Sequence, residues 1–316
     1  MLHRNRSPLP PFRNHRSMRA HQLIESLGLP GHDAAEPPTS TQRFPDGGQY
    51  RIEIPSTEGP RVLRAVLDEA HTRQVPVHRV SQGSGIMLMA ASEITEMLAI
   101  GKDADVEVNL FIGPRATFDI GAQVYAPAGK ALGLAARGAT QLAFALEDLL
   151  HAIGLGLRSV LVSDLGVLQI IGQLKKSGHL PADLIIKTSV MMAPCNPASA
   201  RLMEDLGATT LNIPSDLTIP QIASIRQAVR MPIDFYVEAP DNIGGFLRYY
   251  EIPELIRVAA PIYLKYGLRN SPDVYPAGTH LENTVIALSR ERVRRAQLGQ
   301  EFIARYCPHA VMSPRV

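Results

Sequence analysis

The sequence is poor in cysteine, in aromatic side chains and in net charge. Among its 316 residues there are two cysteines and no tryptophan, and the formal net charge is +2. Cys195 and Cys307 are too few for a disulfide framework, or for a zinc or iron–sulfur site with cysteine ligands alone. A nearly balanced charge also gives no general attraction to nucleic acid.

Long apolar runs are missing as well. No segment approaches the ~20 apolar residues that a membrane-spanning helix needs. The opening "MLHRNRSPLPPFRNHRS" has arginines without the apolar core of a secretory signal. The histidines do not cluster at metal-ligand spacing, which argues against a zinc site. We therefore expect a cytoplasmic protein without membrane, nucleic-acid or iron–sulfur partners and without a cofactor, with a divalent metal as the alternative.

Short apolar runs alternate with longer amphipathic stretches from residue 49 onward. The runs that predict strands are "YRIEIPS", "VPVHRVSQ", "DVEVNLFIG", "RSVLVSD", "DLIIKTSV", "TTLNIPS", "PIDFYVEA" and "PIYLKYGL". The stretches between them predict helices, among them "GPRVLRAVLDEAHTRQ", "VLQIIGQLKKSG" and "TIPQIASIRQAV". Eight such units fit a closed (β/α)8 TIM-type barrel, whose usual size is about 250 residues.

An open doubly wound sheet is the alternative architecture. It requires a glycine-rich phosphate turn after the first strand, whereas the sequence there reads "IPSTEGP". We therefore expect the barrel over residues 49–270. Residues 1–48, rich in proline, arginine and histidine, predict a flexible or loosely docked leader. Residues 271–316 predict a loop and one long amphipathic helix packed on the barrel, through which copies of the chain could associate.

The predicted strands carry polar residues at alternate positions. Alternate strand residues face opposite sides, and the side toward the helices must be apolar, so the polar positions are expected to point into the barrel lumen. A standard barrel fills its lumen with Val, Ile and Leu; this one is predicted to be charged. Such a network is either a set of mutually neutralised pairs or a functional site. The residues concerned are Arg51, Glu53, Arg79, Glu107, Asn109, Lys187, Ser189, Asp234, Tyr236, Glu238, Tyr263 and Lys265.

Barrel enzymes place catalysis at the C-terminal ends of the strands. There, the turn "SQGSG" could hold an anion with its backbone amides. Arg115 and Arg269 could clamp a carboxylate or a phosphate. The residues predicted to bind substrate are Arg79, Ser81, Gln82, Asn109, Arg115, Asp164, Ser189, Asn212, Tyr236 and Arg269.

Two lysines and two glutamates are the predicted catalytic residues. Lys187 or Lys265 could form a Schiff base with a carbonyl, if burial or a neighbouring cation lowers its pKa. The alternative is that each lysine is permanently paired with a carboxylate. Glu53 and Glu238 could act as general acid and base, or could hold a divalent cation together with Asp164.

Three segments in the middle of the chain are distinctive: "VLVSDLGVLQII", "NPASARLMEDLGATTLNIPSDLTIPQIASIR" and "IDFYVEAP". Together they resemble the collagenase-like peptidases, unclassified peptidase family thirty-two, over residues 159–238. The resemblance covers the barrel portion only. It implies a barrel fold and places Asp164, Asn196, Asn212 and Asp216 at the barrel rim.

The sequence departs from the resembled family after the seventh predicted strand. Family members continue with a His-Gly-(Ala/Ser)-(Leu/Met)-Cys signature, and several take part in hydroxylation of nucleic acid or quinones, some with iron–sulfur clusters. Here "VEAPDNIGGF" puts Glu238 at the histidine position and contains no cysteine. We therefore predict an enzyme of lyase or isomerase type that acts on a small carboxylate- or phosphate-bearing substrate. A peptidase-like hydrolase and a non-catalytic binding or partner module are the alternatives.

Overall fold

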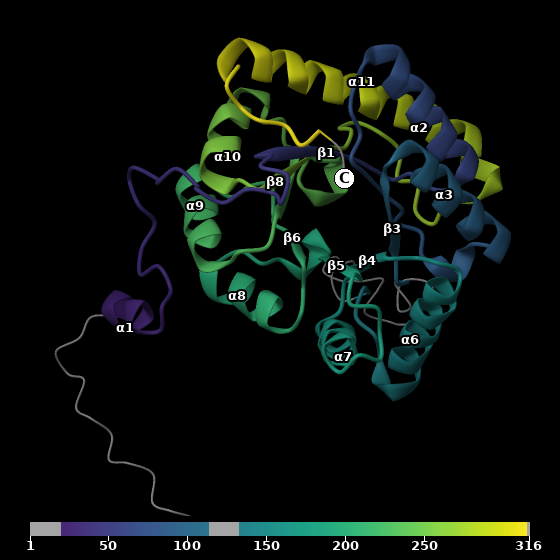
Figure 1. Ribbon diagram of the computed structural model, residues 1–316, viewed down its shortest axis with the longest axis horizontal. Coiled ribbons are helices and arrows are strands. Elements are labelled where there is room, and N and C mark those ends of the chain that lie inside the picture. Colours follow the sequence, from purple (N-terminus) through teal and green to yellow (C-terminus); the bar gives the residue numbers. More distant parts are fainter. Residues whose placement is uncertain (1–19, 114–132, 315–316) are drawn as a thin grey trace, which may run out of the picture.

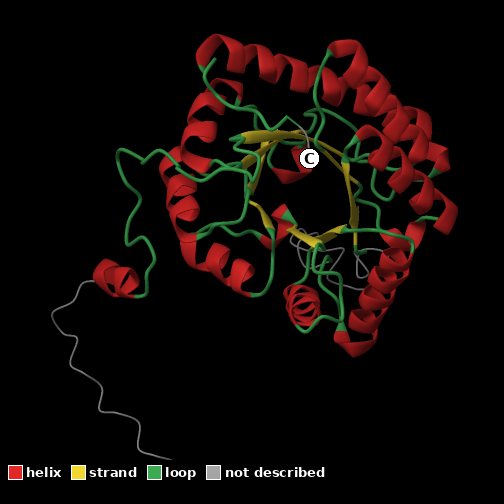
Figure 2. Cartoon of the chain, viewed as in Figure 1, coloured by secondary structure: helices red, strands yellow, loops and turns green. Residues whose placement is uncertain are grey.

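Eight parallel strands close into a barrel at the centre of the molecule (Figures 1 and 2). They are β1 (Tyr50–Pro55), β2 (Arg79–Ser81), β3 (Glu107–Phe111), β4 (Ser159–Val162), β5 (Ile185–Thr188), β6 (Thr210–Asn212), β7 (Ile233–Glu238) and β8 (Ile262–Tyr266). In the computed structural model, which describes residues 20–113 and 133–314, the strands pair in chain order and β8 returns to β1. The predicted (β/α)8 barrel is confirmed.

Helices form a layer around the strands (Figure 2). The layer holds α2 (Pro60–Arg73), α3 (Ala91–Ala104), α6 (Gly138–Gly154), α7 (Leu165–Lys176), α8 (Pro197–Asp205), α9 (Ile219–Ala228), α10 (Ile252–Ala259) and α11 (Glu282–Tyr306). The short helix α1 (Ala20–Ser26) lies apart from this layer (Figure 1). Single 3-10 turns are η1 (Ile86–Leu88), η3 (Val190–Met192), η4 (Asp241–Ile243), η5 (Tyr249–Glu251) and η6 (Thr279–Leu281).

The apolar core lies between the strands and the helices. Residues at alternate strand positions, such as Ile52, Ile54, Phe235 and Leu264, are wholly buried in it. The positions between them hold the charged residues, so the period of two puts the two kinds of side chain on opposite faces of the barrel wall.

Local sequence sets where the helices begin. Asn196 accepts a hydrogen bond from the Ser199 N–H at 2.9 Å, and Thr218 accepts one from the Gln221 N–H at 3.4 Å. A proline follows each of these residues in the first turn, where its missing N–H does no harm. Asn196, at the rim by resemblance, thus serves as a helix cap.

The predicted long C-terminal helix is confirmed as α11. It packs along α2 (Figure 1), and its Gly299 lies against Tyr266 of β8, so that a β-carbon at Gly299 would stand 2.0 Å from the tyrosine oxygen. Among the helices of residues 20–113 and 133–314, α11 included, none combines the length and the apolar character needed to cross a bilayer.

The segment before β1 contacts the helices of the last barrel units. Ser224 on α9 donates a hydrogen bond to Asp33 at 2.7 Å, and the Ser40 N–H donates to the Arg257 carbonyl on α10 at 2.8 Å. Residues 1–19 lie outside the described part of the chain, and the predicted division at residue 48 stays a prediction.

Gly172 on α7 is expected to tolerate no side chain. A β-carbon there would lie 1.9 Å from the Leu206 carbonyl oxygen, so Gly172→Ala should lower the free energy of unfolding by about 1–3 kcal/mol. Gly154→Ala is the matched control, because a β-carbon at this helical glycine meets nothing within 4 Å and should be neutral or stabilise by up to about 1 kcal/mol. Urea unfolding measures both, and equal effects would contradict the packing argument.

Candidate active site in the barrel lumen

Glu53 lies at the centre of the charged lumen. Its side chain is wholly buried, and both carboxylate oxygens accept hydrogen bonds from Lys187 Nζ. Lys265 Nζ lies 3.5 Å from Glu53 Oε1, and Arg79 Nη1 lies 3.4 Å from Oε2. Ser81 Oγ donates to Oε1 at 2.7 Å. One carboxylate therefore faces three cations.

Arg79 extends the network to two more acids. Its Nε lies 2.8 Å from Glu107 Oε1, and its Nη1 lies 3.1 Å from Asp234 Oδ1. The second Asp234 oxygen is 3.7 Å from Lys187 Nζ, and the guanidinium lies over the Tyr263 ring at 3.6 Å. Three acids thus face three bases in a buried, mutually neutralising set, as a charged interior requires. The predicted charged lumen is confirmed.

Two members of the network have a lowered pKa, for different reasons. Burial alone would raise the pKa of Glu53, but the charges of Lys187, Lys265 and Arg79 hold it far below its usual range. Burial lowers the pKa of Lys187 to about 8, with a contribution from Lys265 and against the attraction of Glu53. A group with such a pKa can exchange a proton near neutral pH.

Lys265, Tyr236 and Asn212 form the side of the network toward the C-terminal strand ends. Lys265 Nζ lies 4.0 Å from the centre of the Tyr236 ring. The Asn212 amide, in the orientation that satisfies its neighbours, accepts a hydrogen bond from Lys265 Nζ at 2.9 Å. Tyr236 is partly exposed, whereas Lys187 is wholly buried. Both lysines are buried, but of the two only Lys265 is shown against the ring of this partly exposed tyrosine.

Glu238 does not face the lumen, so its predicted place in the network is wrong. The register of β7 shifts between Tyr236 and Glu238, and Glu238 pairs with Tyr266. The extra residue of this bulge turns the carboxylate out of the lumen. There it accepts a hydrogen bond from Tyr249 Oη at 2.9 Å and lies 3.6 Å from Arg295 Nη1 on α11.

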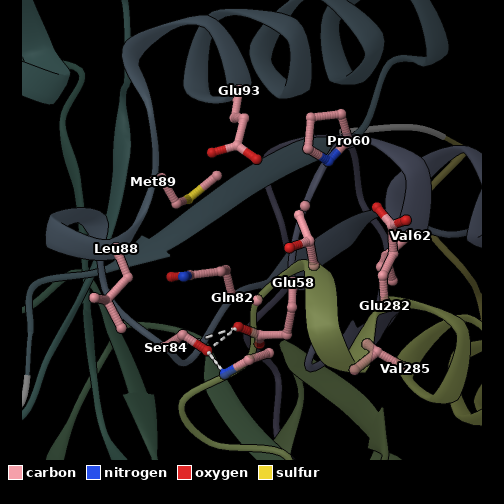
Figure 3. Close-up of a pocket in the computed structure, with 14 residues that line it drawn as sticks. Glu58, Pro60, Val62, Gln82, Ser84, Leu88, Met89, Glu93, Glu282 and Val285 are labelled. Carbon is pink, nitrogen blue, oxygen red and sulfur yellow. Dashed lines mark hydrogen bonds between the residues drawn. The ribbon is translucent and has the colours of Figure 1, made fainter.

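The turn after β2 holds a carboxylate of the chain itself. The Gly83 N–H donates to Glu58 at 2.8 Å. The Ser84 N–H and Oγ donate to it at 3.1 and 2.6 Å (Figure 3). Burial raises the pKa of Glu58 despite these hydrogen bonds. Glu58 therefore fills the backbone cradle that we predicted for a substrate anion, and it lines a pocket with residues of α2, α3 and α11.

Other predicted substrate-binding residues support the backbone or the network. Asp164 accepts a backbone hydrogen bond at 2.8 Å and begins α7, and Ser189 begins η3 in the same way at 3.2 Å. Gln82 bonds to both the N–H and the carbonyl of Gly85. Asn109 donates to a serine hydroxyl of β4 at 2.7 Å. Each of these side chains has a structural partner.

Arg269, one of the two arginines predicted as clamps, is not part of the network. Arg269 is exposed at the rim, where its Nε lies 3.3 Å from Asp241 Oδ1. Arg115 lies outside the described residues. Arg79, predicted to bind substrate, is instead enclosed by the three lumen acids.

The carboxylates predicted as a metal set lie apart. Glu53 is in the lumen, Asp164 begins α7, and Glu238 lies outside the barrel wall. Within residues 20–113 and 133–314, no group of three His, Cys, Asp or Glu side chains could hold a metal ion. The predicted ligand set is therefore not assembled.

Two hydroxyl residues of the network were missed in the sequence. Thr210 Oγ1 donates to Asp234 at 2.7 Å, and Ser159 Oγ donates to Glu107 at 2.5 Å. Strand parity could have identified Thr210, because it lies two residues before Asn212 and so faces the same side of β6. Small hydroxyl residues are so common in strands that parity alone did not mark them as partners of an acid.

The comparisons with known proteins agree with the resemblance in the middle of the chain. The family model for peptidase family U32 matches residues 138–239, from the start of α6 to the end of β7. The resemblance is therefore confirmed for this portion of the barrel. Among curated proteins, none matches this chain.

Solved structures resemble the chain at low sequence identity. The U32 peptidase Mk0906 is 17% identical, with 63% of this chain and 73% of that chain covered and a TM-score of 0.39. The putative copper homeostasis protein CutC from Streptococcus agalactiae is 15% identical, with coverages of 68% and 98% and a TM-score of 0.44. A putative lyase/mutase from Burkholderia cenocepacia J2315 is 13% identical, with coverages of 85% and 86% and a TM-score of 0.45.

Removal of the Glu53 charge is expected to destabilise the barrel. Glu53→Gln leaves three buried cations facing two acids and should lower the free energy of unfolding by about 3–5 kcal/mol. Glu254→Gln removes the partner of Arg257 in an exposed pair and should change it by less than about 1 kcal/mol. Denaturant unfolding compares the two, and a Glu53→Gln protein as stable as the control would contradict the network's role.

The same comparison has an expected pH dependence. The pKa of Glu53 is lower in the folded protein than its unperturbed value of 4.5, so its contribution to stability is complete above pH 4.5 and is lost as the pH falls toward the folded-state pKa. The difference in free energy of unfolding between wild type and Glu53→Gln should therefore shrink below pH 4.5. A difference that stays constant down to about pH 3 would contradict this assignment.

Proposed function

We propose that this protein is a lyase or isomerase that binds a small substrate bearing a carbonyl and a carboxylate or phosphate at the C-terminal mouth of the barrel. Lys265 attacks the carbonyl, and the Lys187–Glu53 pair moves the protons. The position of Lys265 carries the proposal. Its side chain is buried but lies over the partly exposed Tyr236, and its Nζ contacts Glu53 through one oxygen at 3.5 Å.

Lys187 and Lys265 differ in how tightly they are held. Lys187 donates to both oxygens of Glu53 and lies near Asp234, which leaves it enclosed. Lys265 also contacts the neutral amide of Asn212 and an aromatic ring, neither of which neutralises its charge. Lys265 is thus the better candidate for a group that leaves its partners to bond to substrate.

The proton transfers balance along this path. In the form of the protein in which Lys187 is neutral, Lys265 releases a proton through Glu53 to the Lys187 amine, whose pKa of about 8 suits it to accept and return protons near neutral pH. The neutral Lys265 amine then adds to the carbonyl carbon. The carbonyl oxygen leaves as water after it takes one proton from the nitrogen and one back from Lys187. The resulting iminium draws the electron pair of the adjacent C–C or C–H bond, which is the step common to lyases and isomerases of this kind.

A hydrolase of peptide-like bonds is the second candidate, supported by the match to the U32 family model. That match ends at residue 239, and β1, β2 and β8, which supply Glu53, Arg79 and Lys265, lie outside it. A peptidase would be detected by cleavage of unstructured protein or peptide mixtures, an activity that the lysine mechanism does not produce.

Borohydride reduction in the presence of 2-keto acids and sugar phosphates should trap a stable adduct on Lys265. Intact mass followed by peptide mapping locates it. Lys265→Met should abolish the adduct, whereas Lys176→Met, at an exposed surface lysine, should not change it. An adduct on another lysine, or none with any compound of the panel, would contradict the proposal.

The rate of trapping should rise with pH around the Lys187 pKa of about 8, because the neutral form of Lys187 accepts the proton from Lys265. In Lys187→Met this inflection should disappear and trapping should be slower. An unchanged pH profile in Lys187→Met would remove Lys187 from the mechanism.

A further inference from the structure

Arg292 on α11 is a buried cation without an ion pair among the described residues. Its exposed fraction is 4%. Nη1 donates to Ser289 Oγ at 3.2 Å, and Nε has no hydrogen-bond partner in the part of the chain that the structure describes. Burial lowers the pKa of Arg292. A buried guanidinium is normally ion-paired with a carboxylate, and no acid of the described residues lies within ion-pair distance of this one.

Two other buried arginines, Arg79 and Arg248, show the usual arrangement. Arg79 lies within ion-pair distance of three acids, and Arg248 pairs with Glu251 and bonds to two carbonyls. In contrast, the acid whose charge favours the Arg292 cation, Glu58, forms no ion pair with it, and the Glu58 oxygens already accept three hydrogen bonds from the turn after β2. Arg292 therefore has hydrogen-bonding capacity left over.

The groups around Arg292 connect it to the proposed active site. Its charge acts on Tyr236, Tyr275 and Glu58. Tyr236 is the residue whose ring lies under Lys265 Nζ. Tyr275 hydrogen-bonds through its hydroxyl to Ser56, just beyond the C-terminal end of β1, at 2.5 Å. The helix itself passes the C-terminal strand ends: Val285 of α11 lines the pocket that holds Glu58, and Arg295, one turn beyond Arg292, lies 3.6 Å from Glu238 at the end of β7.

We infer that Arg292 binds the oxyanion of the substrate, a carboxylate or a phosphate, while Lys265 meets its carbonyl. This inference rests on the proposed function and names the group that holds the charged end of the substrate. A guanidinium presents parallel N–H donors to either anion. A bound oxyanion would supply the counter-charge and give Nε an acceptor.

Anion binding tests the inference directly. Isothermal titration calorimetry would use inorganic phosphate as the phosphate probe and malonate as the carboxylate probe, at constant ionic strength. Arg292→Met should weaken binding of the preferred anion roughly 10- to 100-fold, as expected for loss of a charged hydrogen-bonding group. Arg292→Lys keeps the positive charge but lacks the paired N–H donors of the guanidinium, so it should weaken anion binding less than Arg292→Met does.

Arg226→Met is the matched control. Arg226 on α9 is also buried, and its Nε and Nη1 also lack hydrogen-bond partners among the described residues, but the acid that acts on it is Glu204 and no residue of the barrel mouth does. Its replacement should leave anion binding unchanged. Equal binding by Arg292→Met and wild type, or no saturable binding of either anion by wild type, would overturn the inference.

Thermal unfolding in anion-free buffer separates binding from a structural role. Arg292→Met removes an uncompensated buried charge, so its Tm should equal or exceed that of wild type. A lower Tm together with unchanged anion binding would make Arg292 a structural residue.

The two proposals fail separately. Arg292-dependent anion binding without a borohydride adduct would retain this inference and reject imine formation at Lys265. A Lys265 adduct together with anion binding that does not depend on Arg292 would support imine formation at Lys265 and reject the inference on Arg292.

Discussion

The contact between Glu53 and Lys187 is the interaction on which the rest of the lumen depends. The two side chains come from β1 and β5, on opposite sides of the barrel, and both are wholly buried. Each would be strongly unfavourable without the other, since an isolated buried charge is far more costly than a buried pair. Because Glu53 also faces Lys265 and Arg79, a single carboxylate couples strands from around the whole ring.

The members of the network differ in how many charged partners hold them. Arg79, Lys187, Glu107 and Asp234 are held by several partners each, so none can leave without exposing an unpaired charge. Lys265 lies at the edge of the set, where its remaining neighbours are the Asn212 amide and the Tyr236 ring. A network that fixes one amine and leaves a second beside it is suited to hold a reactive group in a defined position.

Several groups that were predicted to bind a substrate instead form hydrogen bonds with other groups of the chain. Glu58 takes the amides of the turn after β2, and Asp164 and Ser189 take the first N–H groups of α7 and η3. Such groups resemble ligand sites in sequence, yet they serve the backbone. Arg292 is the contrasting case, because burial has removed it from water and no acid of the described chain pairs with it.

The sequence by itself determined the barrel and the composition of its lumen. Strand and helix patterns alternate eight times, and charged and apolar residues alternate within the strands. Both patterns follow from the local geometry of the backbone, which has a period of two in a strand and 3.6 in a helix. Parity therefore placed Glu53, Arg79, Lys187 and Lys265 on the inner face correctly.

Tertiary structure decided which of these residues meet and which turn away. Parity fails at Glu238, because one extra residue in β7 reverses the direction of every side chain beyond it. Glu58 fills a cradle formed some 25 residues later in the chain, and Arg292 is buried on a helix whose arginines look alike in sequence. Pairing across the barrel depends on distances between distant segments, and local sequence patterns do not contain those distances.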